Sequence, residues 1–443
     1  MLKIVITISL FVYTPIVLAQ NLAPIKTYYD KEKQHINEEY FVINDNDNAN
    51  LIHGKYTKYN FNGKIEIKGQ FENGDKTGIF TSYYDNSNIK QTLNFAHGLQ
   101  EGPVTVYTEN GKLLQKGSFK NNELEGELNL YYSSGKIKST TRFKNGTPDG
   151  KMVEYHENGK VKKEQTYTNG KVNGVAKSYY SNGILKSEEN YLDGILNGYF
   201  KTYHPNGKLD TEANNQSGKR TGTFSTYNNQ GVKTIEGEFL NGKLNGENLA
   251  WYNNTQLKHK FKYANGFKVG KNIEYYENGT VKMEGRFSND EKDADIEEFY
   301  PNSKPKSKTY TVNGKFEGTQ KSWYENGNIK EESTFTNGLE IETHKSYYEN
   351  GSIDTETPYV GNKPVGLEKK YYKNGNLKAT TTYQSGKKHG IIEIFYENGN
   401  LKQKGEYGGN KKVREWKTFT SAGKHVLTEI YENGKLVDTI KID

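Results

Sequence analysis

Hydrophobic and polar positions recur along this chain at one fixed spacing. If the glycine of the phrase Tyr-Glu-Asn-Gly is taken as position 0, that position returns every 24 residues, sixteen times, without an insertion. It is occupied by Gly63, Ser87, Gly111, Gly135, Gly159, Gly183, Gly207, Gly231, Thr255, Gly279, Ser303, Gly327, Gly351, Gly375, Gly399 and Gly423. Such self-similarity predicts an array of small structural units.

Each repeat alternates apolar segments with turn residues. Position −4 is aromatic in all sixteen repeats, position +2 is Ile, Leu or Val in thirteen, and position +8 is Phe or Tyr in fourteen. Position +11 is Gly in twelve repeats and Asn or Asp in the other four. Because these residues best tolerate positive φ, each repeat is expected to form strand, tight turn, strand, tight turn.

The first turn predicts the strand register. Glu-Asn-Gly suits a three-residue hairpin loop, in which a type I turn is followed by a left-handed glycine and a bulge. This loop pairs the aromatic at −4 with the aliphatic at +2, whereas a two-residue loop would pair it with +3, which is Lys in ten repeats. We expect the apolar pairing, with positions −3 and +3 facing away from the apolar side.

The expected fold class is therefore all-β, an elongated and open antiparallel β-meander or solenoid of tandem 24-residue β-hairpin repeats. Sixteen repeats fill residues 55–434. Residues 20–54 are predicted to be a degenerate N-terminal capping unit, and residues 435–443 a C-terminal edge strand.

Composition supports this architecture and excludes several chemistries. Of 443 residues, 32% are hydrophobic and 13% aromatic, with 46 Gly, which is typical of many short strands joined by turns. The net charge of +7 is spread without a basic stripe, so no nucleic-acid partner is expected. The absence of cysteine excludes disulfides, thiolate metal sites and a cysteine nucleophile.

The N-terminus has the features of a secretory signal. Lys3 is followed by the mostly apolar run 4–18, and Val17-Leu18-Ala19 offers a cleavage site. We predict a signal peptide over residues 1–19 and a periplasmic, cell-surface or extracellular location. A retained N-terminal anchor is the alternative.

The repeated phrases resemble a known family. Residues 275–282 and 239–246 are similar to the MORN-repeat variant of bacterial exported proteins. The resemblance implies consecutive β-hairpins in an open, twisted sheet. Some relatives carry the label YwqK-like antitoxin, and classical MORN arrays are associated with membrane attachment and scaffolding. The units around Ser303 and Asp290 depart most from the pattern, with Pro305 at an inward position and Ala294 in place of the usual late glycine, so a kink or local irregularity is expected there.

No catalytic constellation is visible in the sequence. Gly237 and the pair Gly242-Lys243 imitate a phosphate-binding loop, but Leu244 replaces the Ser or Thr that such a loop needs. The histidines are scattered, and His156 and His204 occupy position −3, where other repeats have Tyr. We therefore expect no enzyme activity, no cofactor and no metal site.

One surface pattern is a candidate binding site. Seven consecutive repeats have Tyr at −3, and most of them have Lys at +3. This tyrosine–lysine row comprises Tyr252, Tyr276, Tyr300, Tyr324, Tyr348, Tyr372, Tyr396, Lys258, Lys282, Lys306, Lys330, Lys378 and Lys402. The row could stack on sugar rings or grip a partner, or it could simply stabilise and solubilise a half-exposed sheet.

The sequence thus predicts a non-enzymatic, exported repeat scaffold that binds a protein or a cell-envelope polymer through an extended β surface. Two alternatives stay open. One is a peripheral membrane or lipid-binding MORN-type protein, and the other is an antitoxin or immunity protein.

Overall fold

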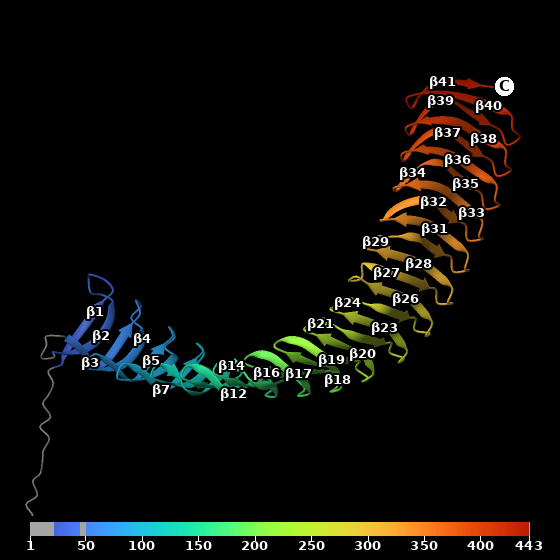
Figure 1. Ribbon diagram of the computed structural model, residues 1–443. Helices are drawn as coiled ribbons and strands as arrows, with labels where there is room; N and C mark the ends of the chain where they lie inside the picture. Colours follow the sequence, from blue (N-terminus) through green and yellow to red (C-terminus); the bar gives the residue numbers. More distant parts are fainter. Residues whose placement is uncertain (1–21, 45–49, 443) are drawn as a thin grey trace, which may run out of the picture. The chain divides into compact units, whose positions relative to one another are not determined.

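The chain is described by a computed structural model that covers residues 22–44 and 50–442, so the predicted signal peptide, residues 1–19, lies outside the described residues. The described residues form 41 β-strands and no α-helix (Figure 1), which confirms the all-β fold class. No helix that could span a membrane is present among them. The chain divides into two compact units, one ending at Leu196 and the other beginning at Asn197, with the boundary inside β17 (Ile195–Tyr203).

Strands before the boundary are β1 (Ala23–Tyr28), β2 (Ile36–Asn44), β3 (Asn50–Tyr59), β4 (Ile65–Glu72), β5 (Asp75–Tyr83), β6 (Ile89–Ala96), β7 (Leu99–Tyr107), β8 (Leu113–Lys120), β9 (Glu123–Leu124), β10 (Gly126–Tyr131), β11 (Ile137–Lys144), β12 (Thr147–Tyr155), β13 (Val161–Thr168), β14 (Lys171–Val172), β15 (Gly174–Tyr179) and β16 (Leu185–Leu192). Strands after it are β18 (Leu209–Gln216), β19 (Lys219–Tyr227), β20 (Lys233–Leu240), β21 (Lys243–Leu244), β22 (Gly246–Trp251), β23 (Leu257–Ala264), β24 (Phe267–Lys268), β25 (Gly270–Tyr275), β26 (Val281–Ser288), β27 (Asp293–Phe299), β28 (Pro305–Val312), β29 (Lys315–Phe316), β30 (Gly318–Trp323), β31 (Ile329–Thr336), β32 (Leu339–Tyr347), β33 (Ile353–Val360), β34 (Lys363–Pro364), β35 (Gly366–Tyr371), β36 (Leu377–Gln384), β37 (Lys387–Phe395), β38 (Leu401–Gly408), β39 (Lys411–Phe419), β40 (His425–Glu432) and β41 (Lys435–Lys441).

Each compact unit is an open antiparallel sheet of consecutive hairpins. Among the described residues, β1 pairs only with β2 and β41 only with β40. Position −4 pairs with position +2 in all sixteen repeats, as in Tyr59 with Ile65 and Phe395 with Leu401. The predicted register is confirmed. The proposed bounds of the capping unit and of the edge strand stay predictions.

The first turn of each repeat has the predicted geometry. In the first repeat, the Asn60 N–H donates to the Lys64 carbonyl (2.8 Å) and the Gly63 N–H donates to the Asn60 carbonyl (2.9 Å). Gly63 has a φ of 76°, and even Thr255 holds a φ of 69° at the equivalent position. A three-residue loop that ends in a left-handed residue is therefore imposed on every repeat.

The second turn is a two-residue loop at positions +10 and +11. Both residues have positive φ, as in Asn145 (48°) and Gly146 (70°), which is the type I′ combination. The expected irregularity is confirmed after Ser288, which pairs with Asp293 across a four-residue loop, but the expectation was wrong at Pro305, which keeps the regular pairing with Phe299. Other repeats place two extra residues in a bulge around position +15, usually at a positive-φ glycine. Ala294 stands at this position, and here the extra residues lie in the turn instead.

The expectation about which face is apolar was wrong. One extra residue after position +2 shifts the side-chain alternation, so that +2 and +5 lie on the same face. The ion pair between Lys233 and Glu236, and the 3.0 Å contact between His425 and Thr428, join these two positions along a strand. Position +8 then lies on the opposite face from −4 and +2, because a one-residue slip inverts every later side chain. That opposite face, which includes +3, holds the most buried side chains.

The deepest contacts join position −7 to a small residue at position +6. Phe80 and Trp416, at −7, are 6% and 1% exposed. Their partners across the strand pair are Gly69 and Gly405, where an added Cβ atom would lie 2.4 Å and 2.2 Å from the facing ring. Aromatic side chains at +8 complete this layer, as Tyr407 does with its ring centroid 5.1 Å from that of Trp416. The large side chain requires glycine as its neighbour.

The contact between Gly405 and Trp416 generates the first prediction. Gly405→Ala should lower the free energy of unfolding of the surrounding repeats by about 1–3 kcal/mol, because the new methyl group overpacks the indole. Hydrogen exchange of residues 401–432 measures this loss. In a Trp416→Val background the same substitution should cost much less. An equal cost in both backgrounds would contradict the proposed packing.

Candidate functional site

The structure places the seven tyrosines of the tyrosine–lysine row at the start of successive first turns. Each hydroxyl donates a hydrogen bond to the backbone carbonyl of the residue at −4 in the next repeat. The pairs are Tyr252 with Tyr275, Tyr276 with Phe299, Tyr300 with Trp323, Tyr324 with Tyr347, Tyr348 with Tyr371, Tyr372 with Phe395, each at 2.8 Å, and Tyr396 with Phe419 at 2.9 Å. All seven side chains are half-buried. The hydroxyls are thus committed to joining repeats.

The lysines of the row divide into two groups. Four of them place Nζ above the tyrosine ring of the same repeat. The distance from Nζ to the ring centroid is 5.6 Å for Lys258, 5.9 Å for Lys330, 5.6 Å for Lys378 and 5.4 Å for Lys402. The other two form ion pairs, Lys282 with Glu274 (2.8 Å) and Lys306 with Glu298 (3.3 Å). The hydrogen bond to Glu274 raises the pKa of Lys282. Lys282 and Lys306 therefore have their positive charges compensated by glutamates. The four lysines above tyrosine rings do not pair with these carboxylates.

Sequence reasoning missed one member of the row. Position +3 of the repeat that contains Tyr348 is Asp354, which leaves a gap in the lysine pattern. Lys373, from the next first turn, fills it, with Nζ 5.9 Å from the centroid of the Tyr348 ring. Burial, reinforced by the hydrogen bond with Asp354, raises the pKa of Tyr348 to about 12. Five of the seven tyrosine rings in the row therefore have a lysine ammonium group above them.

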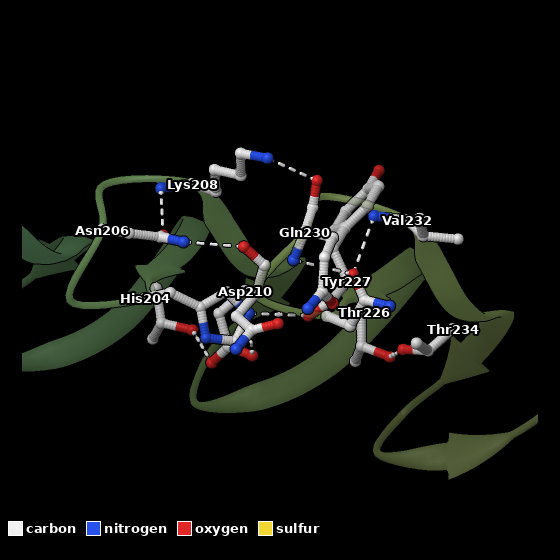
Figure 2. A network of polar contacts seen from close by, with 12 residues as sticks. His204, Asn206, Lys208, Asp210, Thr226, Tyr227, Gln230, Val232 and Thr234 are labelled. Carbon is white, nitrogen blue, oxygen red and sulfur yellow. Dashed lines mark hydrogen bonds and ion pairs between the residues drawn. The ribbon is translucent and has the colours of Figure 1, made fainter. Parts of the chain in front are cut away.

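Histidine and asparagine make the same kind of repeat-to-repeat contact, as Figure 2 shows around His204. The His204 Nε2 atom lies 2.8 Å from the Tyr227 carbonyl. Asn206 donates from Nδ2 to the Asn229 carbonyl (2.7 Å), and its Oδ1 accepts from the Lys208 N–H (3.1 Å). The residues of the Tyr-x-Asn-Gly phrase thus satisfy backbone groups of their own turn and of the next one. The phrase is a determinant of the fold.

Some acidic and basic groups elsewhere on the sheet form ion pairs. One shallow hollow over the strands β38 and β39 contains both signs of charge. Its carboxylates are engaged, Glu406 with Arg414 (2.7 Å) and Glu415 with Lys417 (2.9 Å). In the portion of the chain that the structure covers, no three His, Asp or Glu side chains gather in a way that could hold a metal ion.

These observations define a tandem β-hairpin repeat protein whose turns are joined by side-chain hydrogen bonds. Family comparison gives the same class. The MORN repeat variant family matches twelve segments that together cover more than half of the chain, and the chain belongs to this family. The matched segments are 52–73, 76–97, 100–121, 124–145, 148–169, 172–193, 196–214, 268–289, 316–337, 343–360, 364–385 and 388–407.

Comparisons with individual proteins give less. No curated protein matches the chain. Among solved structures, it is similar to a crystal structure of TcdB2-TccC3-Cdc42, with 11% identity, a TM-score of 0.13, and coverage of 94% of this chain and 26% of that chain. It is also similar to a crystal structure of TcdB2-TccC3-TEV, with 12% identity, a TM-score of 0.14, and coverage of 95% of this chain and 25% of that chain. This chain spans about a quarter of those chains, and TM-scores of this size support no inference about it.

The tyrosine hydrogen bonds generate the second prediction. Tyr324→Phe should lower the free energy of unfolding by about 1 kcal/mol, because the Tyr347 carbonyl loses its donor. Chemical denaturation measures the change. Tyr310→Phe is the matched control, since Tyr310 is 43% exposed and its hydroxyl has no hydrogen-bond partner among the described residues. Equal effects of the two substitutions would count against the role of the inter-repeat bond.

Proposed function

We propose that this protein is an exported, non-enzymatic repeat scaffold that binds a protein or a cell-envelope polymer along the surface of its sheet. The observation that supports this proposal is the tyrosine–lysine row. It presents a half-buried tyrosine ring in each of seven consecutive repeats, at a spacing of two strands, about 10 Å, and a lysine ammonium group above five of these rings. A surface of this kind suits an extended partner better than a small molecule.

The part of the row that a partner can reach is narrower than its thirteen residues. The hydroxyls bond to the next repeat, and the ammonium groups of Lys282 and Lys306 are held by carboxylates. We therefore expect a partner to contact the edges of the tyrosine rings and the exposed lysines Lys258, Lys330, Lys378 and Lys402. Aromatic rings with nearby cations are common anchors in binding surfaces.

Export is the second element of the proposal and rests on residues 1–19. A mature chain that begins near residue 20 would meet secreted proteins and envelope polymers. These are the partners to be sought.

The third prediction tests the row without disturbing the fold. Residues 20–443, immobilised, should retain a partner from secreted proteins or envelope material. The fourfold variant Lys258→Gln, Lys330→Gln, Lys378→Gln and Lys402→Gln should lose most of this retention, because it removes four of the five cations above tyrosine rings but leaves the tyrosine hydrogen bonds. The matched Lys→Arg variant, which keeps the charges, should retain the partner.

Two results would contradict the proposal at different levels. Equal retention by the wild type and by the Lys→Gln variant would remove the tyrosine–lysine row as the contact. Failure of the wild-type protein to retain anything from either source would remove the scaffold function itself.

A further inference from the structure

A second row of lysines lies at the other end of the hairpins. Position +12, the first residue after the second turn, is lysine in four successive repeats, at Lys363, Lys387, Lys411 and Lys435. All four side chains are exposed. We call these residues the second-turn lysine row. Eight residues of extended chain, about 26 Å, separate each of them from the first turn of the same repeat, so this surface is distinct from the tyrosine–lysine row.

The fold does not require lysine at this position. In the first compact unit the same position is occupied by Asp75, Leu99, Glu123, Thr147, Lys171 and Ile195, so five of six repeats form their second turn without lysine there. Tyrosine at −3 and glycine at 0 are different, because the turn uses the hydroxyl of the first and the positive φ of the second. Four consecutive lysines at a permissive position therefore point to a role outside folding.

The structure holds the lysine stems in place and leaves the charges uncompensated. An added Cβ atom on Gly386 would lie 3.6 Å from Lys363, and one on Gly434 would lie 3.4 Å from Lys411, so the stems of these two lysines lie against the turn of the next repeat. The residues paired with Lys363, Lys387 and Lys411 across the turn are neutral, and only Lys435 is paired with a carboxylate residue, Glu432. Within residues 22–44 and 50–442, no ion pair involves any of the four lysines.

Exposed apolar side chains lie beside this row on the same face. The Lys412 Nζ atom lies 4.2 Å from the centroid of the Trp416 ring, so positions +13 and +17 share one face and positions +12 and +16 share the other. At +16, Leu367 is 44% exposed and Ile391 is 50% exposed. Val360, paired across the turn with Lys363, is 64% exposed. Around Lys363 and Lys387 the row therefore combines cations with exposed apolar side chains.

We infer that the second-turn lysine row binds a linear polyanion, a polymer whose carboxylate or phosphate groups recur along its chain. Successive repeats are two strands apart, so the four ammonium groups form a line with a pitch of about 10 Å. A flexible anionic chain can lie across the strands and reach all four, while its apolar surfaces contact the neighbouring aliphatic side chains. A bilayer surface, in contrast, favours a broad basic cluster over a row one lysine wide.

This inference goes beyond the proposed function, because it assigns another surface and a chemical class of partner. Polygalacturonate is the probe, and fully methyl-esterified polygalacturonate is its uncharged control. The protein comprising residues 20–443 should bind the acidic polymer, with affinity that falls as salt rises, and should not bind the ester. The variant Lys363→Gln, Lys387→Gln, Lys411→Gln and Lys435→Gln should bind roughly tenfold more weakly or worse.

The matched control is the Lys→Gln variant of Lys258, Lys330, Lys378 and Lys402, which changes the net charge equally and should keep most of the binding. Circular dichroism checks that both variants fold, and Lys→Arg at the second-turn row should restore binding. Equal losses in both variants, binding of the ester, or binding to anionic vesicles but not to the polymer would each overturn the inference. A partner retained through the tyrosine–lysine row despite any of these results would leave the proposed function standing.

Discussion

Hydrogen bonds from turn side chains to the backbone of the next repeat are the interaction on which this structure depends. A single-layer sheet has a thin core. In this protein the core consists of the side chains at −7, the small residues at +6 that they contact, and the aromatic side chains at +8. Tyr324, His204 and Asn206 each bond to a carbonyl in the following turn. Because every repeat relies on its neighbours in this way, stability accumulates along the array and no repeat is expected to fold alone.

The same constraint separates residues that serve the fold from residues that are free to serve binding. Tyrosine and histidine at position −3 bond to the next carbonyl, as Tyr324 and His204 do, and position 0 is restricted to residues that accept positive φ. Positions +3 and +12 carry no such restriction, as Asp354 and Asp75 show. Because the fold does not fix the residue at these two positions, the lysines found there are the residues most free to serve the binding of a partner.

Much of the fold could be predicted from the sequence, because a strict period fixes strands, turns and register together. Pairing of aromatic −4 with aliphatic +2 followed from the three-residue loop together with the preference for apolar residues opposite one another. The apolar face could not be assigned, since the bulge after +2 inverts the later alternation and leaves no mark in composition. For the site, the thirteen residues were located in the sequence, but the bonds made by their hydroxyls, and the contribution of Lys373, depend on how adjacent turns stack. Those contacts require coordinates.

Excision of one full period tests the dependence on stacked turns most directly. Removing residues 328–351 joins Gly327 to Ser352 and lets Tyr324 donate to the carbonyl of Tyr371. Hydrogen exchange should then show the flanking repeats as protected as before, whereas removing only residues 328–339 should expose them, because the turns no longer superimpose. Equal protection after both excisions, or loss of protection after removal of the full period, would contradict the account.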